Sequence, residues 1–212
     1  MYLVVIAAVT LCGCATSKVS LSETDRSQLH RVCLITEYDV RNDAVPNFDM
    51  RVVGTLIRNT DPRPILREAI LSSVRADDPV KIAFVPEAEA LWFDKNISPK
   101  ETNDRLRTLL QPQGFDGIFL VRGTSGFSQA GGGRVVMRLD MSGRIFRLQD
   151  NKQIYQRFEY QLFGGDYAVP LQSSSDGLMV KNTLDGTTWR NSLETFTRKH
   201  WTTWLSKDVM NR

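Results

Sequence analysis

The alternation of apolar and polar residues is clearest in the second half of the chain. Apolar side chains occupy every second position of residues 135–141, and residues 145–148 continue the run after Ser142-Gly143, where we expect a bulge or bend. Turn residues follow at 150–152, and residues 154–163 alternate again. The pattern predicts a long antiparallel hairpin with one buried face and one solvated face.

Shorter apolar runs predict three buried strands, at residues 31–36, 81–85 and 117–121. Two other stretches have the composition of loops. The first is glycine-rich and extends from Gly123 to Gly133, and the second, residues 164–185, is polar in its middle. We therefore expect both stretches to be loops.

Apolar residues at helical spacing predict helices at about residues 47–58 and 65–74. Ser98-Pro99-Lys100-Glu101 resembles a capped helix start, and this third helix should end before Pro112. A last helix, residues 187–205, carries an aromatic stripe that we expect to pack on a sheet. Together these elements predict an α/β fold, with a mixed sheet, helices packed on it, a long antiparallel hairpin and a C-terminal helix.

The amino-terminal segment has a different pattern, an uncharged apolar run at residues 3–10 followed by Leu11-Cys12-Gly13-Cys14. The run is too short to span a bilayer, which requires about 20 helical residues, but it matches the core of a signal peptide. The usual basic residue is missing from Met1-Tyr2. A buried first strand ending in Cys-Gly-Cys is the structural alternative.

Leu11-Cys12-Gly13-Cys14 resembles a lipobox, the processing site of bacterial lipoproteins. The resemblance implies that residues 1–13 are a signal peptide, that cleavage precedes Cys14, and that acyl chains on Cys14 attach the protein to a membrane. Ala15 follows the cysteine in place of Asp. By resemblance to enterobacterial lipoproteins, this favours the outer membrane, with the protein facing the periplasm.

Residues 14–30 are polar and rich in Ser and Thr, and we expect them to form a flexible, lipidated tether. Residues 31–212 are then expected to form a single α/β domain. Cys33 would be the one cysteine left without lipid in the mature chain. We expect it to be buried and inert, with no internal disulfide.

Composition narrows the function classes. The hydrophobic fraction of 42% and the charged fraction of 24% are those of an ordinary globular protein. The net charge is +3 without any Lys/Arg-rich block, so we expect no nucleic-acid partner. His30 and His200 have no Cys, Asp or Glu at metal-ligand spacing, and Gly131-Gly132-Gly133 precedes a strand instead of a helix. We expect no metal, no cofactor and no catalytic residue set.

Two small groups of residues remain as candidates for function. Trp92-Phe93 follows the predicted second strand, and we expect either a partner contact or a place in the core. With Tyr167, these aromatic residues could instead line a ligand groove. A carboxylate-dependent hydrolase would need Glu87 and Glu89, or Asp116, in one concave site.

The order of elements resembles the lipoprotein group that shares the fold of the TolB amino-terminal domain and includes the curli-secretion lipoprotein. Four features carry the resemblance: the strand at 31–36 after a tether, Lys81-Ile82-Ala83-Phe84-Val85-Pro86, the step from Gly114 to Gly123, and the hairpin from Leu139 to Gln156. Residues 40–78 and the terminal helix have no counterpart in the resemblance.

The resemblance implies a non-enzymatic protein that acts through protein contacts and often forms rings. We therefore expect a lipid-anchored accessory or scaffold protein for envelope assembly, transport or cell-wall synthesis, with an envelope protein or a second copy as partner. A small-ligand or glycan-binding module is the alternative, and a hydrolase is the third hypothesis.

Overall fold

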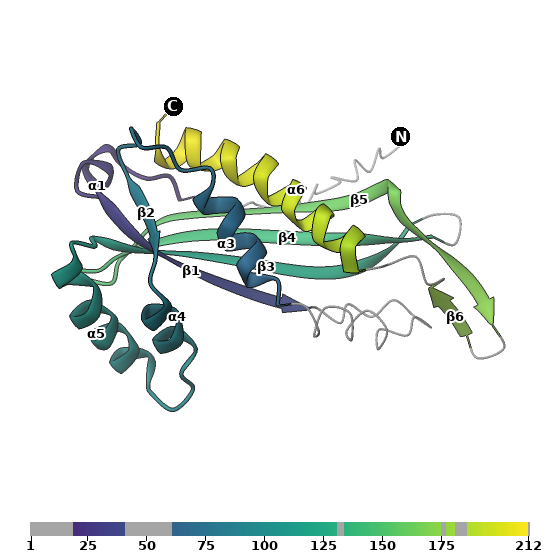
Figure 1. Ribbon diagram of the computed structural model, residues 1–212, viewed down its shortest axis with the longest axis horizontal. Coiled ribbons are helices and arrows are strands. Elements are labelled where there is room, and N and C mark those ends of the chain that lie inside the picture. Colours follow the sequence, from purple (N-terminus) through teal and green to yellow (C-terminus); the bar gives the residue numbers. More distant parts are fainter. Residues whose placement is uncertain (1–18, 41–60, 131–133, 175–176, 181–185, 212) are drawn as a thin grey trace, which may run out of the picture.

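The computed structural model describes residues 19–40, 61–130, 134–174, 177–180 and 186–211 (Figure 1). In these residues the strands form one mixed sheet in the order β2-β1-β3-β4-β5-β6. β1 runs parallel to β2 and β3, and the remaining neighbours are antiparallel. The strand bounds are β1 Arg31–Val40, β2 Lys81–Phe84, β3 Gly117–Ala130, β4 Arg134–Arg147, β5 Gln153–Ser174 and β6 Gly177–Val180.

Helices cover both faces of the sheet. The helix bounds are α1 Glu23–Ser27, α3 Arg63–Leu71, α4 Pro86–Phe93, α5 Pro99–Leu110, the 3-10 helix η1 Gln111–Gln113, α6 Gly186–Trp204 and the π-helix η2 Leu205–Val209. α3 and α6 pack on one face, and α4 and α5 pack on the other (Figure 1). This arrangement confirms the predicted α/β class with its mixed sheet, antiparallel hairpin and C-terminal helix.

The core under α3 and α6 is built around two tryptophans of α6. Trp201 and Trp204 are almost fully buried, and the Trp201 ring meets Phe119 of β3 edge-on at 5.5 Å. Gly143 of β4 lies directly below Trp201, since a Cβ atom at this position would come within 2.9 Å of the Trp201 Cζ3 atom. The absence of a side chain there is what lets α6 lie close to the sheet.

Gly143 therefore has a role different from the predicted one. The prediction of a bulge or bend at Ser142-Gly143 is wrong, because β4 passes through these residues in regular register with Arg122 and Val121 of β3. The register shifts between β4 and β5 occur elsewhere, at Val136/Met137 and at Ile145/Phe146.

The opposite core, under α4 and α5, is smaller. Leu106 and Leu110 of α5 and Ala88 of α4 cover Cys33 and Ile35 of β1. The predicted start of α5 is confirmed, because the Ser98 Oγ atom accepts a hydrogen bond from the Glu101 N–H at 3.2 Å. α4 was not expected from the sequence.

Both stretches predicted as loops contain strand. β3 continues through the glycine-rich segment to Ala130, where it pairs with Arg134, and β5 continues to Ser174 and pairs with β6. The reason is that a neighbouring strand supplies the backbone hydrogen bonds, so local composition does not decide where these strands end.

The domain also begins earlier than predicted. Val19 forms a two-hydrogen-bond bridge with Gln156 at the edge of β5, with N···O distances of 2.9 and 3.0 Å. Leu21 and Leu29, on either side of α1, are buried in the core under α3 and α6. The flexible tether expected up to residue 30 is therefore wrong for residues 19–30.

Several predictions concern residues that lie outside the described ranges. These are the signal peptide, the lipidated Cys14, and the helix expected at residues 47–58. Within the described ranges, none of the helices combines the length and the apolar composition that crossing a bilayer requires.

Candidate functional site

The carboxyl end of α4 places two aromatic side chains at the surface. Trp92 is half-buried, and its Nε1–H donates a hydrogen bond to the Glu37 Oε1 atom of β1 at 2.5 Å. Phe93 is 38% exposed, and the Arg63 guanidinium of α3 lies 5.3 Å from the centre of its ring. Trp92 is thus held by the sheet, while Phe93 is available for contact.

The same two residues form one wall of a groove of about 540 Å³. The groove lies between the end of α4, the start of α5 and the turn that joins β4 to β5. Ile118 of β3 and Phe146 of β4 contribute to it from the sheet. Its other lining residues are Asp94, Lys95, Ile97, Pro99, Thr102, Asn103 and Asn151.

The polar residues of the groove differ in what they already bind. The Asp94 carboxylate accepts hydrogen bonds from the Asn96 backbone and side chain, and the Thr102 hydroxyl donates to the Ser98 carbonyl. The Asn103 and Asn151 amides have no hydrogen-bond partner among the residues that the structure describes, nor does Lys95 have an ion-pair partner there. The groove therefore combines aromatic and aliphatic walls with neutral amides available to a ligand.

A second feature, one helical turn before Trp92 and Phe93 on α4, is the ion pair between Glu89 and Arg67 at the edge of the sheet. β2 ends at Phe84, which pairs with Leu34, so β1 continues past Leu34 without a neighbour on this side. Beyond this point the Glu89 Oε1 atom accepts hydrogen bonds from the Thr36 N–H at 3.3 Å and the Thr36 hydroxyl at 2.8 Å. Glu89 thus caps the edge of β1 where the neighbouring strand has ended.

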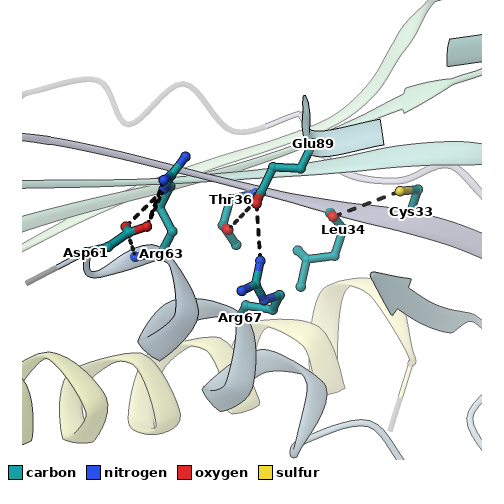
Figure 2. Close-up of polar contacts among 7 residues, drawn as sticks. All are labelled: Cys33, Leu34, Thr36, Asp61, Arg63, Arg67 and Glu89. Carbon is teal, nitrogen blue, oxygen red and sulfur yellow. Dashed lines mark hydrogen bonds and ion pairs between the residues drawn. The ribbon is translucent and has the colours of Figure 1, made fainter. Parts of the chain in front are cut away.

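The other oxygen of Glu89 binds α3. Its Oε2 atom lies 3.2 Å from the Arg67 guanidinium, and Figure 2 shows Glu89 between Thr36 and Arg67. Arg67 also stacks over the Phe84 ring at 3.8 Å. Glu89 therefore joins α4, β1 and α3, which is a structural role.

Asp61 and Arg63 form a neighbouring pair at the start of α3 (Figure 2). The Arg63 Nε and guanidinium nitrogens donate to both Asp61 oxygens, at 2.7–3.0 Å. Hydrogen bonding from Arg63 lowers the pKa of the Asp61 carboxyl below its ordinary value. The pair fixes the direction in which Arg63 approaches Phe93.

The carboxylates proposed for a hydrolase are not brought together. Asp116 accepts hydrogen bonds from the backbone N–H groups of His30 and Arg31, at 2.8 and 3.0 Å, at the amino end of β1. Glu89 binds Thr36, five residues further along β1, roughly 16 Å away. Glu87 is exposed on α4. Glu89 and Asp116 therefore share no cleft, and each holds backbone groups.

The remaining candidate residues give a mixed outcome. Cys33 is buried, as predicted, and burial raises the pKa of its thiol to about 12. Tyr167 lies in the distal half of β5, beside Val136 and Met137 of β4 and roughly 30 Å along the sheet from Phe146, so it does not join Trp92 and Phe93 in the groove. Among the described residues, no three His, Cys, Asp or Glu side chains gather as metal ligands. The side chain of His200 lies outside the description.

Neither a protein-family model nor a curated protein matches the chain. Solved structures are similar at low identity. The PelC dodecamer of Paraburkholderia phytofirmans is 10% identical over 92% of this chain and 96% of that chain, with a TM-score of 0.45. The hypothetical protein CT253 of Chlamydia trachomatis is 14% identical over 87% and 99%, also at 0.45.

A third similar structure is the lipoprotein GNA1162 of Neisseria meningitidis, which is 15% identical over 69% of this chain and 88% of that chain, with a TM-score of 0.35. At these identities and TM-scores the similarity identifies no family and is not evidence for a shared function.

Proposed function

We propose that this chain is a non-enzymatic lipoprotein of the bacterial envelope that acts as an accessory or scaffold through protein contacts. The observation that carries the proposal is Leu11-Cys12-Gly13-Cys14 at the end of an apolar run of signal-peptide length. Cleavage before Cys14 and acylation of this residue anchor the protein without a spanning helix.

The position of the folded domain supports an anchored role. Val19 already belongs to the sheet edge, so five residue steps separate Cys14 from the domain. Fully extended, such a segment spans at most about 18 Å. The domain is thus held close to the membrane, where it meets other envelope components. Ala15 directs the protein to the outer membrane, facing the periplasm.

The contact surface is the exposed end of α4. Phe93 is exposed at the rim of the groove, and Trp92, Arg63 and the Asp61 pair hold this region in place. An exposed aromatic residue beside a pocket is typical of a contact site. We expect its partner to be a protein of envelope assembly, transport or cell-wall synthesis, or a second copy of this chain.

The main reason to prefer a contact role over catalysis is that the candidate catalytic carboxylates already bind backbone groups. Glu89 and Asp116 are both bound by backbone N–H groups of β1 and are separated along the strand. A glycoside hydrolase needs its two carboxyl groups within about 10 Å of each other. The groove gives one observation in favour of a second function, ligand binding, because its Asn103 and Asn151 amides have no described partner.

Membrane sorting tests the anchored location. The wild-type chain, expressed in a Gram-negative cell and fractionated on a sucrose gradient, is expected in the outer-membrane fractions. Ala15→Asp should move it to the inner-membrane fractions, whereas the matched control Ala15→Ser should not. Recovery of the wild-type chain in the soluble periplasmic fraction would contradict the proposal.

Chemical cross-linking in intact cells, followed by mass spectrometry of the tagged protein, tests the contact role. We expect links to an envelope protein or to a second copy, and their loss in Phe93→Ala. Lys199→Ala, an exposed change on α6, is the control and should keep them. Absence of any link, or equal links in Phe93→Ala, would overturn the contact surface.

A further inference from the structure

We infer that the groove between α4, α5 and the sheet is a binding site for a neutral saccharide, such as a short stretch of a pyranose glycan. The inference rests on the proposed envelope role and assigns a ligand to the groove beside the Phe93 contact surface. Its volume of about 540 Å³ lies in the range of small-molecule sites, which is about 300–1,000 Å³.

The apolar walls suit the C–H face of a sugar ring. Trp92, Phe93 and Phe146 contribute aromatic rings from α4 and β4, and Ile118 is a buried residue of β3. The hydrogen bond from Trp92 to Glu37 fixes the indole before a ligand arrives. A fixed aromatic wall costs little conformational entropy on binding, which favours recognition of a flat, weakly apolar surface.

The polar groups suit hydroxyls. Asn103 lies at the start of α5, and Asn151 lies in the β4–β5 turn with a φ of 55°. Each amide offers two N–H donors and one carbonyl acceptor, and neither has a partner among the described residues. The charged lining residues are one acid, Asp94, and one base, Lys95. The balance gives no preference for an anion or a cation, which is why the ligand is assigned as neutral.

A peptide strand fits the groove less well. An extended peptide usually binds by pairing with a free strand edge. The groove instead lies against the inner strands β3 and β4, whose backbones pair with each other through Ile118 and Phe146. At β3 and β4, a ligand in the groove therefore finds no free strand edge with which to pair. A sugar satisfies its hydroxyls with side-chain amides and needs no backbone partner.

Isothermal titration calorimetry tests the assignment. The full-length chain, in a zwitterionic detergent without a sugar headgroup, is titrated with chitotriose, cellotriose and maltotriose. Binding of at least one is expected. Asn103→Ala should weaken it about two- to tenfold, the effect of one neutral hydrogen bond. Asn151→Gly should do the same, because glycine keeps the positive φ while removing the amide. Asn191→Ala, exposed on α6, is the control.

The source of the sugar is resolved by co-sedimentation with insoluble chitin or cellulose. A chain that binds the trisaccharides and also sediments recognises polymer, and one that stays in solution recognises free oligosaccharide. No binding to any trisaccharide, or binding that Asn103→Ala and Asn151→Gly leave unchanged, overturns the saccharide site. If Phe93-dependent protein cross-links persist in that case, the proposed function stands and the groove is a protein contact. If they are also absent, both fail.

Discussion

The two faces of the sheet are covered by helices in different ways. On one face, α6 is 19 residues long and, with α3, closes a core that includes Trp201, Trp204 and Phe119. On the other face, α4 and α5 have 8 and 12 residues. They bury Cys33 and Ile35 but leave Phe146 half-exposed beside an open groove.

The difference shows that short helices can complete a core and still leave a site at its margin. Where α6 crosses the sheet, the absence of a side chain at Gly143 leaves room for the Trp201 ring to pack on β4. Beside the connection from α4 to α5, Phe146 of β4 stays half-exposed and lines the groove. The α3–α6 face should therefore determine stability, and the α4–α5 face should determine binding.

The largest effect is expected when the two faces are compared directly. Trp201→Ala should lower the free energy of unfolding by about 3–5 kcal/mol, because it leaves a cavity in a closed core. Phe93→Ala should cost less than about 1 kcal/mol, since its ring is 38% exposed. Urea unfolding followed by circular dichroism measures both. Similar losses for the two variants would contradict the division of roles.

The next effect concerns the close packing of α6 on β4. Gly143→Ala should destabilise by about 1–3 kcal/mol, because the added methyl group overlaps the Trp201 ring. Combining it with Trp201→Phe should cost less than the sum of the two single changes, since the smaller ring leaves room for the methyl group. The same unfolding measurement gives the coupling. If the stability losses of the two single variants are simply additive in the double variant, the contact between Gly143 and the Trp201 ring is not what limits the size of residue 143.

A smaller effect is expected at the edge of β1. Glu89→Gln removes the charge that pairs with Arg67 and weakens the cap on Thr36, and it should cost about 1–2 kcal/mol. Glu87→Gln, on the same helix but exposed, should change stability by less than about 0.5 kcal/mol. Thermal unfolding of both variants at one pH makes the comparison. If Glu89→Gln and Glu87→Gln change stability equally, Glu89 is not a structural link between α3 and α4.

The smallest effect is the pH dependence contributed by Asp61. Arg63 lowers the pKa of Asp61 in the folded state, so its stabilisation is present above the unfolded pKa of about 4 and is lost as pH falls through the folded pKa. Because the Asp61–Arg63 pair is partly exposed, Asp61→Asn should lower the free energy of unfolding by less than about 1 kcal/mol at pH 7. In stronger acid it should have no effect. Asp77→Asn, also exposed, is the control. A cost that persists unchanged in acid would contradict this origin.

Local patterns predicted the parts of the fold that depend on neighbours in sequence. Ser98 caps α5 because its partner, Glu101, is three residues away, and the stripe of α6 repeats within one helix. The alternation at residues 154–163 likewise belongs to one strand, β5. Such signals are contained in a short window of sequence.

The remainder depends on partners far apart in the chain. The length of β3 is set by β4, and the role of Gly143 is set by Trp201, 58 positions later. α4 was missed because its apolar residues lie on all sides, although Pro86 at its first turn is a helix-start signal. The link from Glu89 to Arg67 and Thr36 had no local signal. In the groove, Trp92 and Phe93 were predicted, but Asn103 and Asn151 were not.

Metabolic labelling with an alkynyl palmitate analogue, followed by capture of the labelled protein, tests directly whether Cys14 is lipidated. We expect label on the wild-type chain and on Cys12→Ala, because Cys12 leaves with the signal peptide. Cys14→Ala should carry no label and should remain unprocessed. A wild-type chain without label, or a Cys14→Ala chain that retains it, would contradict the lipid anchor on which the proposed function rests.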